Sequence, residues 1–267
     1  MKKRLDEVLV EKALVSTRSK AKEQIVNRKE VYVNNVLITK AGFMVSETDL
    51  IDIRLKQSTF VSRAGLKLEK TIKDWKIDLN NKVCLDIGAS TGGFTQVCLE
   101  NNASLVYAVD VGTDQLDESL KNNKLVKDMQ KYNFRYAKKE DFDKNIEFFC
   151  CDVSFISLDK ILPTLNSLIQ EQTSGVVLIK PEFEAGSELA KNGKVNLKST
   201  HLQVIKNFIY YSKENGFSVD RLTYSPIVGN KKQNIEYLAY LTKTEKQKNW
   251  KDEELNKVVN QSWKYLT

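Results

Sequence analysis

Residues that interrupt or cross-link a chain are scarce in this sequence. Its 267 residues include 3 prolines, 11 glycines, 4 cysteines and one histidine. So few prolines and glycines argue against long flexible or proline-rich segments. The cysteines show no C-x-x-C spacing, and together with the single His201 they argue against a zinc site, so we expect no metal. The cysteines fall in apolar patterns and are predicted to be reduced core residues: Cys84, Cys98, Cys150 and Cys151.

Long apolar runs are also missing. None approaches the ~18 residues that a membrane-spanning helix needs, and residues 1–7 lack the apolar core of a signal peptide. The composition is that of an ordinary globular protein, with 41% hydrophobic and 29% charged residues. We therefore expect a cytoplasmic protein without membrane contact, long enough for one large domain and a smaller one.

Positive charge is concentrated near the N-terminal end of the sequence. The net charge is +7, and residues 1–29 hold nine lysines and arginines against four acids. A clustered basic excess favours a polyanion such as nucleic acid as the partner. A solvated helix face would have the same composition, and the charge count alone leaves both interpretations open.

Residues 4–60 have the pattern of a small α+β module. Two helices that face one core are predicted from apolar residues at helical spacing, namely Leu5, Val8, Leu9 and Leu14 in the first and Ala21, Ile25 and Val26 in the second. Short strands are predicted at 31–33 and 36–38 around the pair Asn34–Asn35, which tolerates left-handed backbone. A third strand is predicted at 50–55.

The order of this module resembles the RNA-binding domain shared by a small-subunit ribosomal protein, pseudouridine synthases and bacterial tyrosyl-tRNA synthetases. The matching residues are Arg4-Leu5-Asp6, Leu9, Ser16-x-Arg18-x-Lys20-Ala21 and Val31-x-Val33-Asn34. The resemblance implies that the module docks on RNA. The basic residues predicted to contact RNA, one of them in the linker that follows the module, are Arg4, Arg18, Lys20, Lys22 and Arg63.

The segment 83–94 runs from an apolar strand through a glycine-rich turn into a helix. Glycines let a backbone approach a ligand closely, and the first turn of a helix presents unpaired N–H groups. A second apolar strand ends on Asp110, 22 residues after Gly88, where an acid can accept both hydroxyls of an adenosine ribose. The glycine-rich turn is preceded by an acid, Asp86, and contains no lysine. Such a turn favours a cationic ligand without phosphates, such as S-adenosylmethionine, with NAD as the alternative. The predicted cofactor-binding residues are Asp86, Gly88, Ala89, Ser90, Gly92, Gly93, Phe94, Asp110 and Asp152.

From residue 80 onward, apolar strands alternate with amphipathic helices. This alternation predicts a parallel sheet with helices on both faces. In such sheets ligands bind at the carboxyl ends of the strands. Four charged residues are predicted to lie there: Asp86, Asp110, Asp152 and Lys180.

Separated motifs over most of the chain resemble the TlyA family, the so-called haemolysin A proteins. They are Val61-Ser62-Arg63-x-Gly65-x-Lys67-Leu68, residues 85–95 and 106–112, Asp152-Val153-Ser154-Phe155, Lys180-Pro181-x-Phe183-Glu184 and Asn234-x-Glu236-Tyr237-Leu238. The resemblance implies an FtsJ-like methyltransferase domain at 61–267 that uses S-adenosylmethionine, joined to an RNA-binding domain at 1–60. The implied fold class is α/β, a Rossmann-like methyltransferase with a doubly wound, mostly parallel sheet plus a small α+β domain.

The resemblance also implies a catalytic set and a substrate. The set maps to Lys67, Asp152, Lys180 and Glu236. The substrate implied by the resemblance is the 2′-hydroxyl of cytidine in large-subunit ribosomal RNA, with some family members also modifying the small subunit. Ribosomal RNA or ribosomal subunits are therefore the expected partners.

A ribose hydroxyl is a poor nucleophile, so its methylation needs positioning and the removal of one proton. Our hypothesis is that Lys180 accepts this proton, Lys67 lowers the pKa of Lys180 and helps fix the hydroxyl, and two acids orient the lysines. The chain lacks the Asp/Asn-Pro-Pro loop typical of amine methylation, and none of its cysteines follows a proline. Three alternatives stay open: ordinary ion pairs at these positions, a membrane-active haemolysin, and an RNA-binding protein without catalysis.

Overall fold

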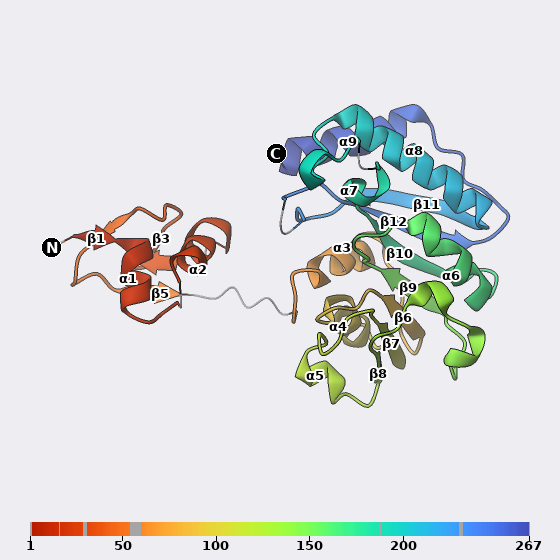
Figure 1. Cartoon of the computed structure of the whole chain (residues 1–267), viewed down its shortest axis with the longest axis horizontal. Helices are drawn as coiled ribbons and strands as arrows, with labels where there is room; N and C mark the ends of the chain where they lie inside the picture. The colour runs from red at the N-terminus through yellow and green to blue at the C-terminus, as the bar shows by residue number, and fades with distance from the viewer. Residues whose placement is uncertain are drawn as a thin grey trace. The chain divides into compact units, whose positions relative to one another are not determined.

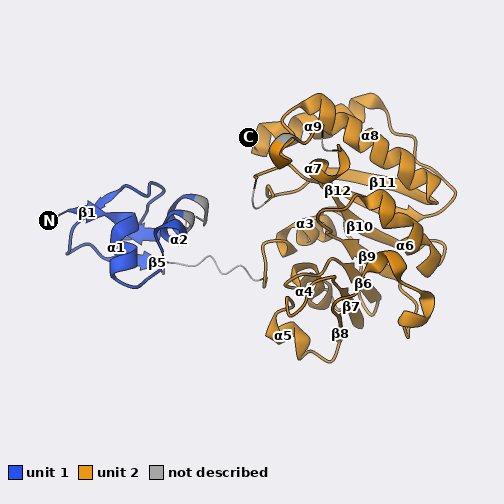
Figure 2. Ribbon diagram, viewed as in Figure 1, with its two compact units in different colours: residues 1–59 blue, residues 60–267 orange. Residues whose placement is uncertain are grey.

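The computed structural model describes residues 2–15, 17–28, 31–53, 60–186, 188–229 and 232–266. It divides into two compact units, residues 1–59 and residues 60–267 (Figure 2). Each unit has a hydrophobic core of its own, and each is described by itself.

The first unit is a small α+β structure. Its elements are β1 (Lys3–Arg4), α1 (Leu5–Glu11), α2 (Arg18–Lys22), a π-helical segment (Glu23–Arg28), β2 (Val31–Val33), β3 (Val36–Leu37), β4 (Met44–Val45) and β5 (Ile51–Ile53). Strand β1 pairs with β4, and β2 lies between β3 and β5, all antiparallel. The helices pack on these strands through apolar residues such as Leu5, Leu9, Ala21 and Ile25.

Two details of the first unit differ from the sequence prediction, and one agrees. Asn34 and Asn35 adopt φ of 50° and 67°, which confirms the left-handed turn. Leu14 is exposed because α1 ends at Glu11 and the chain turns there. Val26 is also exposed, because the chain is π-helical from Glu23 onward and the apolar face no longer follows the α-helical period. Strand β5 covers part of the predicted third strand, whose positions 54 and 55 lie outside the described residues.

The second unit is built on a seven-stranded sheet in the order β11-β12-β10-β9-β6-β7-β8. The strands are β6 (Val83–Ile87), β7 (Leu105–Val109), β8 (Val126–Met129), β9 (Phe148–Cys151), β10 (Ser174–Ile179), β11 (Phe217–Tyr224) and β12 (Tyr237–Lys243). Five neighbouring strands, from β10 to β8, are parallel, and β12 runs antiparallel to both of its neighbours. The predicted doubly wound, mostly parallel sheet is confirmed.

Helices cover both faces of this sheet (Figure 1). They are α3 (Gly65–Trp75), α4 (Gly93–Glu100), α5 (Glu118–Lys121), α6 (Leu162–Leu168), α7 (Pro181–Glu184), α8 (Lys198–Glu214) and α9 (Asp252–Leu266), with 3₁₀ turns at Phe134–Tyr136, Lys139–Asp141, Leu158–Lys160 and Lys191–Gly193. Helices α3 and α4 pack on one face with residues such as Leu68 and Phe94. Helices α6, α8 and α9 pack on the other with residues such as Leu165, Phe208 and Leu255.

Alternate residues of each central strand enter the two different cores, as a pleated strand requires. All four cysteines are buried and none forms a disulfide, as predicted. Among the described residues, no helix combines the length and the apolar character needed to cross a membrane.

Candidate active site

Four charged side chains meet at the carboxyl edge of the parallel strands. The Lys67 Nζ lies 2.8 Å from Glu236 Oε2 and 3.3 Å from Asp152 Oδ2. The other oxygen of Asp152, Oδ1, lies 2.5 Å from Lys180 Nζ. The side chains therefore form one continuous chain in the order Glu236, Lys67, Asp152, Lys180. The structure thus brings together the whole set that the sequence suggested as catalytic.

The sheet topology explains why residues so distant in sequence meet. Asp152 and Lys180 each follow the last residue of a strand, and those strands, β9 and β10, are parallel neighbours. Strand β12 begins at this same edge, because it is antiparallel to β10 and pairs Tyr237 with Ile179. Glu236, which precedes Tyr237, therefore arrives beside the other two.

Lys67 comes from the first turn of α3, on one face of the sheet. Close packing of the N-terminal ends of α3 and α4 brings it there: a Cβ placed on Gly93 would lie only 2.9 Å from the backbone nitrogen of Gly65 and 2.3 Å from Ser62 Oγ. A larger residue at position 93 would separate the two helices and withdraw Lys67 from the acids.

Burial and mutual attraction act on the charge states of these side chains in opposite directions. Lys67, Lys180 and Glu236 are each less than 10% exposed: 7%, 9% and 3%. Burial by itself would lower the pKa of Lys67, but the charges of Asp152 and Glu236 outweigh it and raise that pKa above its usual value. Burial likewise opposes the ionisation of Asp152, yet the two lysines hold its pKa below the usual range. Burial raises the pKa of Glu236, with Lys67 opposing the shift.

Three groups that the sequence prediction did not assign lie near Lys180: Ser154 and Phe155 from the loop after β9, and Phe183 from α7. The Lys180 Nζ donates a hydrogen bond of 2.9 Å to Ser154 Oγ. Phe155 is 85% exposed and has a φ of +64°, a left-handed conformation that is strained for a bulky residue. Its ring lies 5.2 Å from that of Phe183, centroid to centroid, and Lys180 Nζ lies 5.9 Å from the Phe183 ring. All three lie inside motifs visible in the sequence, but only the structure shows that Ser154 and Phe183 lie near Lys180 and that Phe155 packs on Phe183.

The far end of the same loop is fixed by Glu184. Its carboxylate accepts hydrogen bonds from the Leu158 backbone N–H (2.9 Å), the Ser157 hydroxyl (2.5 Å) and the Tyr211 hydroxyl (2.9 Å). Burial raises the pKa of Glu184, and these donors oppose the shift. Glu184 ends the short helix α7, which begins directly after Lys180, so one local structure holds both the loop and Lys180.

The glycine-rich loop lies against this group. Gly88 has a φ of +83°, and a Cβ there would lie 2.6 Å from the backbone oxygen of Asp152, so only glycine fits. Asp110 follows β7, and its carboxylate accepts backbone N–H bonds from Ser90 (2.8 Å) and Gly112 (2.7 Å). Carboxylate oxygens have further lone pairs, so Asp110 can still accept ribose hydroxyls.

Four further residues predicted to bind a cofactor are buried, namely Ala89, Gly92, Gly93 and Phe94. Gly92 precedes α4 and has a φ of +94°. The ring of Phe94 is part of the apolar core, so this residue could offer a ligand only its backbone.

Asp86 is fully buried in β6, directly before the glycine-rich loop. Its Oδ2 accepts a hydrogen bond of 2.6 Å from the Thr95 hydroxyl, while Oδ1 has no hydrogen-bond partner in the described part of the chain. Burial raises the pKa of Asp86 to about 7. A cationic ligand would relieve the cost of burying this charge.

The predicted RNA-contacting residues lie on both units. Arg4 and Arg18 hydrogen-bond to the buried Asp6 at 3.0 to 3.1 Å, with their side chains still about half exposed. Lys20 and Lys22 are exposed on α2. Arg63, in the second unit, donates a hydrogen bond of 3.1 Å to the Val228 carbonyl. A guanidinium has five N–H donors, so these arginines keep some for a polyanion.

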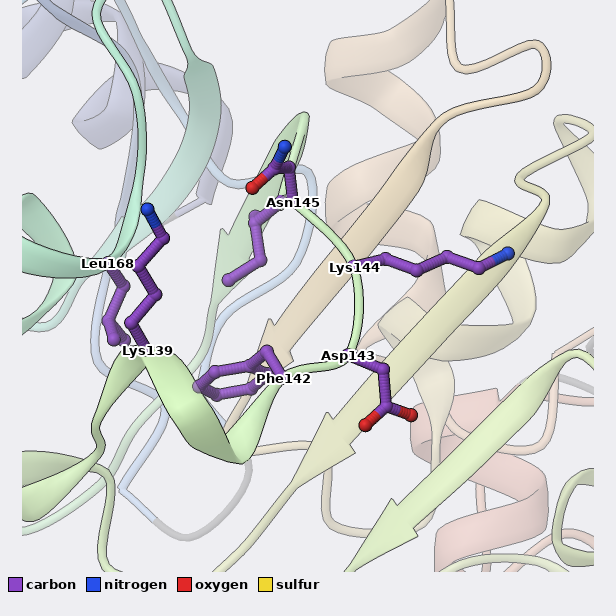
Figure 3. Close-up of a pocket in the computed structure, with 7 residues that line it drawn as sticks. Lys139, Phe142, Asp143, Lys144, Asn145 and Leu168 are labelled. Carbon is purple, nitrogen blue, oxygen red and sulfur yellow. The ribbon is translucent and has the colours of Figure 1, made fainter.

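A pocket of about 290 Å³ lies elsewhere, at the amino end of β9 (Figure 3). It is lined by Lys139, Phe142, Asp143, Lys144, Asn145, Ile146 and Leu168. None of the four charged residues described above lines it. Among the described residues, no group of three or more His, Cys, Asp or Glu side chains could hold a metal ion.

Comparison with known proteins identifies families that the two units match. Residues 60–243 match the FtsJ-like methyltransferase family and residues 3–51 match the S4 domain. The chain is 40% identical over 270 residues to YqxC of Bacillus subtilis, a protein whose name describes an rRNA methyltransferase (99% of this chain, 95% of the relative). It is 34% identical over 254 residues to the 23S rRNA (cytidine-2′-O)-methyltransferase TlyA of Campylobacter jejuni (88% and 97%).

The chain belongs to the TlyA family of FtsJ-like methyltransferases. A solved structure from Streptococcus thermophilus, described as a haemolysin, shares this fold with a TM-score of 0.79 and 40% identity, covering 99% of this chain and 96% of the other. The family resemblance seen in the motifs is thus confirmed.

S-adenosylmethionine is the cofactor of this methyltransferase family. The glycine-rich loop and its neighbours fit this cofactor. Asp86 has a buried carboxylate oxygen without a hydrogen-bond partner among the described residues, which a cationic group could pair with. Gly88 leaves room beside Asp152, and the Asp110 carboxylate can accept hydrogen bonds from ribose hydroxyls. The residues present therefore agree with the cofactor of the family, and NAD is not needed to explain the loop.

Proposed function

We propose that this protein transfers a methyl group from S-adenosylmethionine to the 2′-oxygen of a cytidine in large-subunit ribosomal RNA. One observation carries the chemistry: Glu236, Lys67, Asp152 and Lys180 form an unbroken chain of contacts beside the glycine-rich loop. The cytidine and the large subunit come from the named activity of the Campylobacter jejuni relative.

In this proposal Lys180 is the general base. A free lysine has a pKa of about 10.4 and is mostly protonated near neutrality, so the amine must be made available. Lys67 is the source of that effect, because its two carboxylate partners keep it positively charged and a nearby ammonium disfavours a second one. When bound, S-adenosylmethionine supplies a methyl group on a sulfonium, which a ribose oxygen can attack directly.

The acids act on the lysines rather than on the substrate. Asp152 contacts both Lys67 and Lys180, and so fixes the distance between them. Glu236 contacts Lys67 and favours its charged form. The Phe183 ring lies near Lys180, and the largely exposed Phe155 ring packs against it. The two rings suit stacking against a base of single-stranded RNA.

Two other functions make different demands on the chain. Neither a membrane-active haemolysin nor an RNA-binding protein without catalysis requires four charged side chains, three of them buried, in contact at a sheet edge. The contacts among these residues therefore favour the enzyme. Leakage of dye from liposomes treated with the purified protein would support the haemolysin instead.

The deciding experiment is transfer of labelled methyl to each ribosomal subunit isolated from cells that lack the gene, followed by mapping of the modified nucleotide. We expect label on one cytidine ribose of the large subunit, and loss of transfer in Lys180→Ala with cofactor binding retained. Lys257→Ala, an exposed lysine of α9, is the matched control and should stay active. Label on a base, or full activity of Lys180→Ala, would overturn the proposal.

A further inference from the structure

Lys180 is held by two acceptors that differ in kind. One is the carboxylate of Asp152, at 2.5 Å, and the other is the hydroxyl oxygen of Ser154, at 2.9 Å. Asp152 belongs to the set of four charged residues, whereas Ser154 has no role in the chemistry proposed above. Both residues lie in the loop that follows β9, two positions apart.

A neutral lysine amine has two N–H bonds and one lone pair on a tetrahedral nitrogen. The fourth tetrahedral position of the nitrogen is occupied by its bond to Cε. When Asp152 and Ser154 each accept one N–H, the lone pair has a single direction left. We propose that the Ser154 hydroxyl is a positioning group, which together with Asp152 aims the lone pair of Lys180 at the ribose 2′-hydroxyl. This inference rests on the proposed function and deepens it.

The backbone around Ser154 supports a fixed orientation. The next residue, Phe155, is held at a φ of +64°, a strained conformation that persists only where surrounding structure enforces it. Glu184 supplies that enforcement by accepting three hydrogen bonds, two of them from the loop residues Ser157 and Leu158. With Asp152 tied to Ile87 by a backbone hydrogen bond of 3.0 Å, the loop is anchored on both sides of Ser154.

The proton transfer balances without a change in Ser154. The O2′–H bond breaks, its electron pair stays on oxygen for the bond to the methyl carbon, and the proton goes to the Lys180 nitrogen. The ammonium formed has three N–H bonds, of which Asp152 and Ser154 accept two. Ser154 neither gains nor loses a proton.

The charged groups near Lys180 determine the expected pH effect. Among the residues that the structure describes, they are Asp152 from the β9 loop and Lys67 from α3, with Glu236 beyond Lys67. A hydroxyl oxygen stabilises an ammonium more than a neutral amine, because the hydrogen bond is charge-assisted. Removing the hydroxyl should therefore lower the pKa of Lys180, even as it leaves the lone pair badly aimed.

Two variants separate this role from a structural one. Ser154→Ala removes the acceptor, whereas Ser154→Thr keeps the hydroxyl and adds a methyl group at an exposed position. Single-turnover methyl transfer is measured against pH with saturating cofactor. We expect Ser154→Ala to lower the plateau rate about tenfold while its rising limb moves to lower pH, and Ser154→Thr to stay within about twofold of the unmodified protein.

A readout that needs no RNA tests the inference even if the proposed function fails. Lysines labelled at Cε are titrated by NMR in the full-length protein, and Lys180→Ala identifies the signal of Lys180. Ser154→Ala should move its titration midpoint to lower pH, and Ser154→Thr should not. An unmoved midpoint in Ser154→Ala, or equal impairment of both variants, would overturn the role of Ser154. Absence of methyl transfer by the unmodified protein would instead overturn the proposed function.

Discussion

Lys67 and Lys180 are the same amino acid in one small site, yet they have different partners. Lys67 contacts two carboxylates and is held in the charged form. Lys180 shares one carboxylate with Lys67, and its second partner is a neutral hydroxyl. This difference in partners is the reason that the proposed mechanism assigns the role of base to Lys180 rather than to Lys67.

Asp86 gives a prediction at the same scale. Its pKa of about 7 arises from burial, and S-adenosylmethionine is cationic, so the ligand should bind better when Asp86 is ionised. The ionised fraction falls as the pH drops through 7, and we expect cofactor affinity to fall with it between about pH 8 and pH 6. Asp86→Asn should bind about tenfold more weakly at pH 8 and lose this component of the pH dependence.

Calorimetric titration measures the effect at Asp86. The amino group of the ligand titrates as well, so the difference between the two pH profiles isolates Asp86. The control is Asp78→Asn, at an exposed position outside the loop, which should follow the unmodified protein. If cofactor affinity had the same pH dependence in Asp86→Asn and in the unmodified protein, ionisation of Asp86 would not contribute to cofactor binding.

At the scale of elements, the turn between β6 and α4 depends on glycine for two reasons at once. Gly88 needs a left-handed backbone, and it also lies against the Asp152 carbonyl. Gly193 shares the first property, with a φ of +72°, but a Cβ there would meet nothing within 4 Å. The pair therefore distinguishes backbone strain from steric conflict.

We predict that Gly193→Ala lowers the free energy of unfolding by about 1 kcal/mol, from strain alone. Gly88→Ala should lower it by about 2–4 kcal/mol, because displacement of Asp152 adds to the strain. Only Gly88→Ala should also weaken cofactor binding and methyl transfer. Denaturant unfolding and calorimetry check both quantities, and equal losses of stability for the two variants would contradict the close approach to Asp152.

The secondary structure of the large unit was predictable because each strand and helix has a local sequence pattern. Apolar strands that end on Asp110, Asp152 and Lys180 indicate a parallel sheet with its charges at one edge, and the structure has this arrangement. The prediction from local pattern that Leu14 and Val26 are buried was wrong, because one helix ends before Leu14 and the other becomes π-helical before Val26. Helix ends and π-helical turns depend on neighbouring segments that the periodicity of one segment does not reflect.

At the scale of the whole molecule, the first unit concentrates positive charge and the second holds the candidate active site. Lys20 and Lys22 are exposed on α2, whereas Arg4 and Arg18 are also engaged with Asp6. We predict that the double change Lys20→Glu with Lys22→Glu raises the KM for ribosomal RNA and leaves kcat and cofactor affinity unchanged. The salt dependence of log KM should become shallower by about two, one for each RNA phosphate that a lysine no longer neutralises.

The measurement is steady-state methyl transfer at several salt concentrations. The double change Lys257→Glu with Lys264→Glu, at two exposed positions of α9 in the other unit, is the matched control for net charge. A KM and salt slope that match the control would show that α2 does not contact the RNA.

The sequence alone determined the order of elements, the class of fold, the family and a short set of residues worth testing, because strands, turns and motifs are local features of the chain. Only the tertiary structure decided which side chains touch: that Lys67 has two carboxylate partners, that Ser154 holds Lys180, and that Phe94 enters the core. The physical reason is that each of these contacts joins segments from different strands and helices. Such contacts arise when an antiparallel β12 and a closely packed α3 bring their ends to one sheet edge.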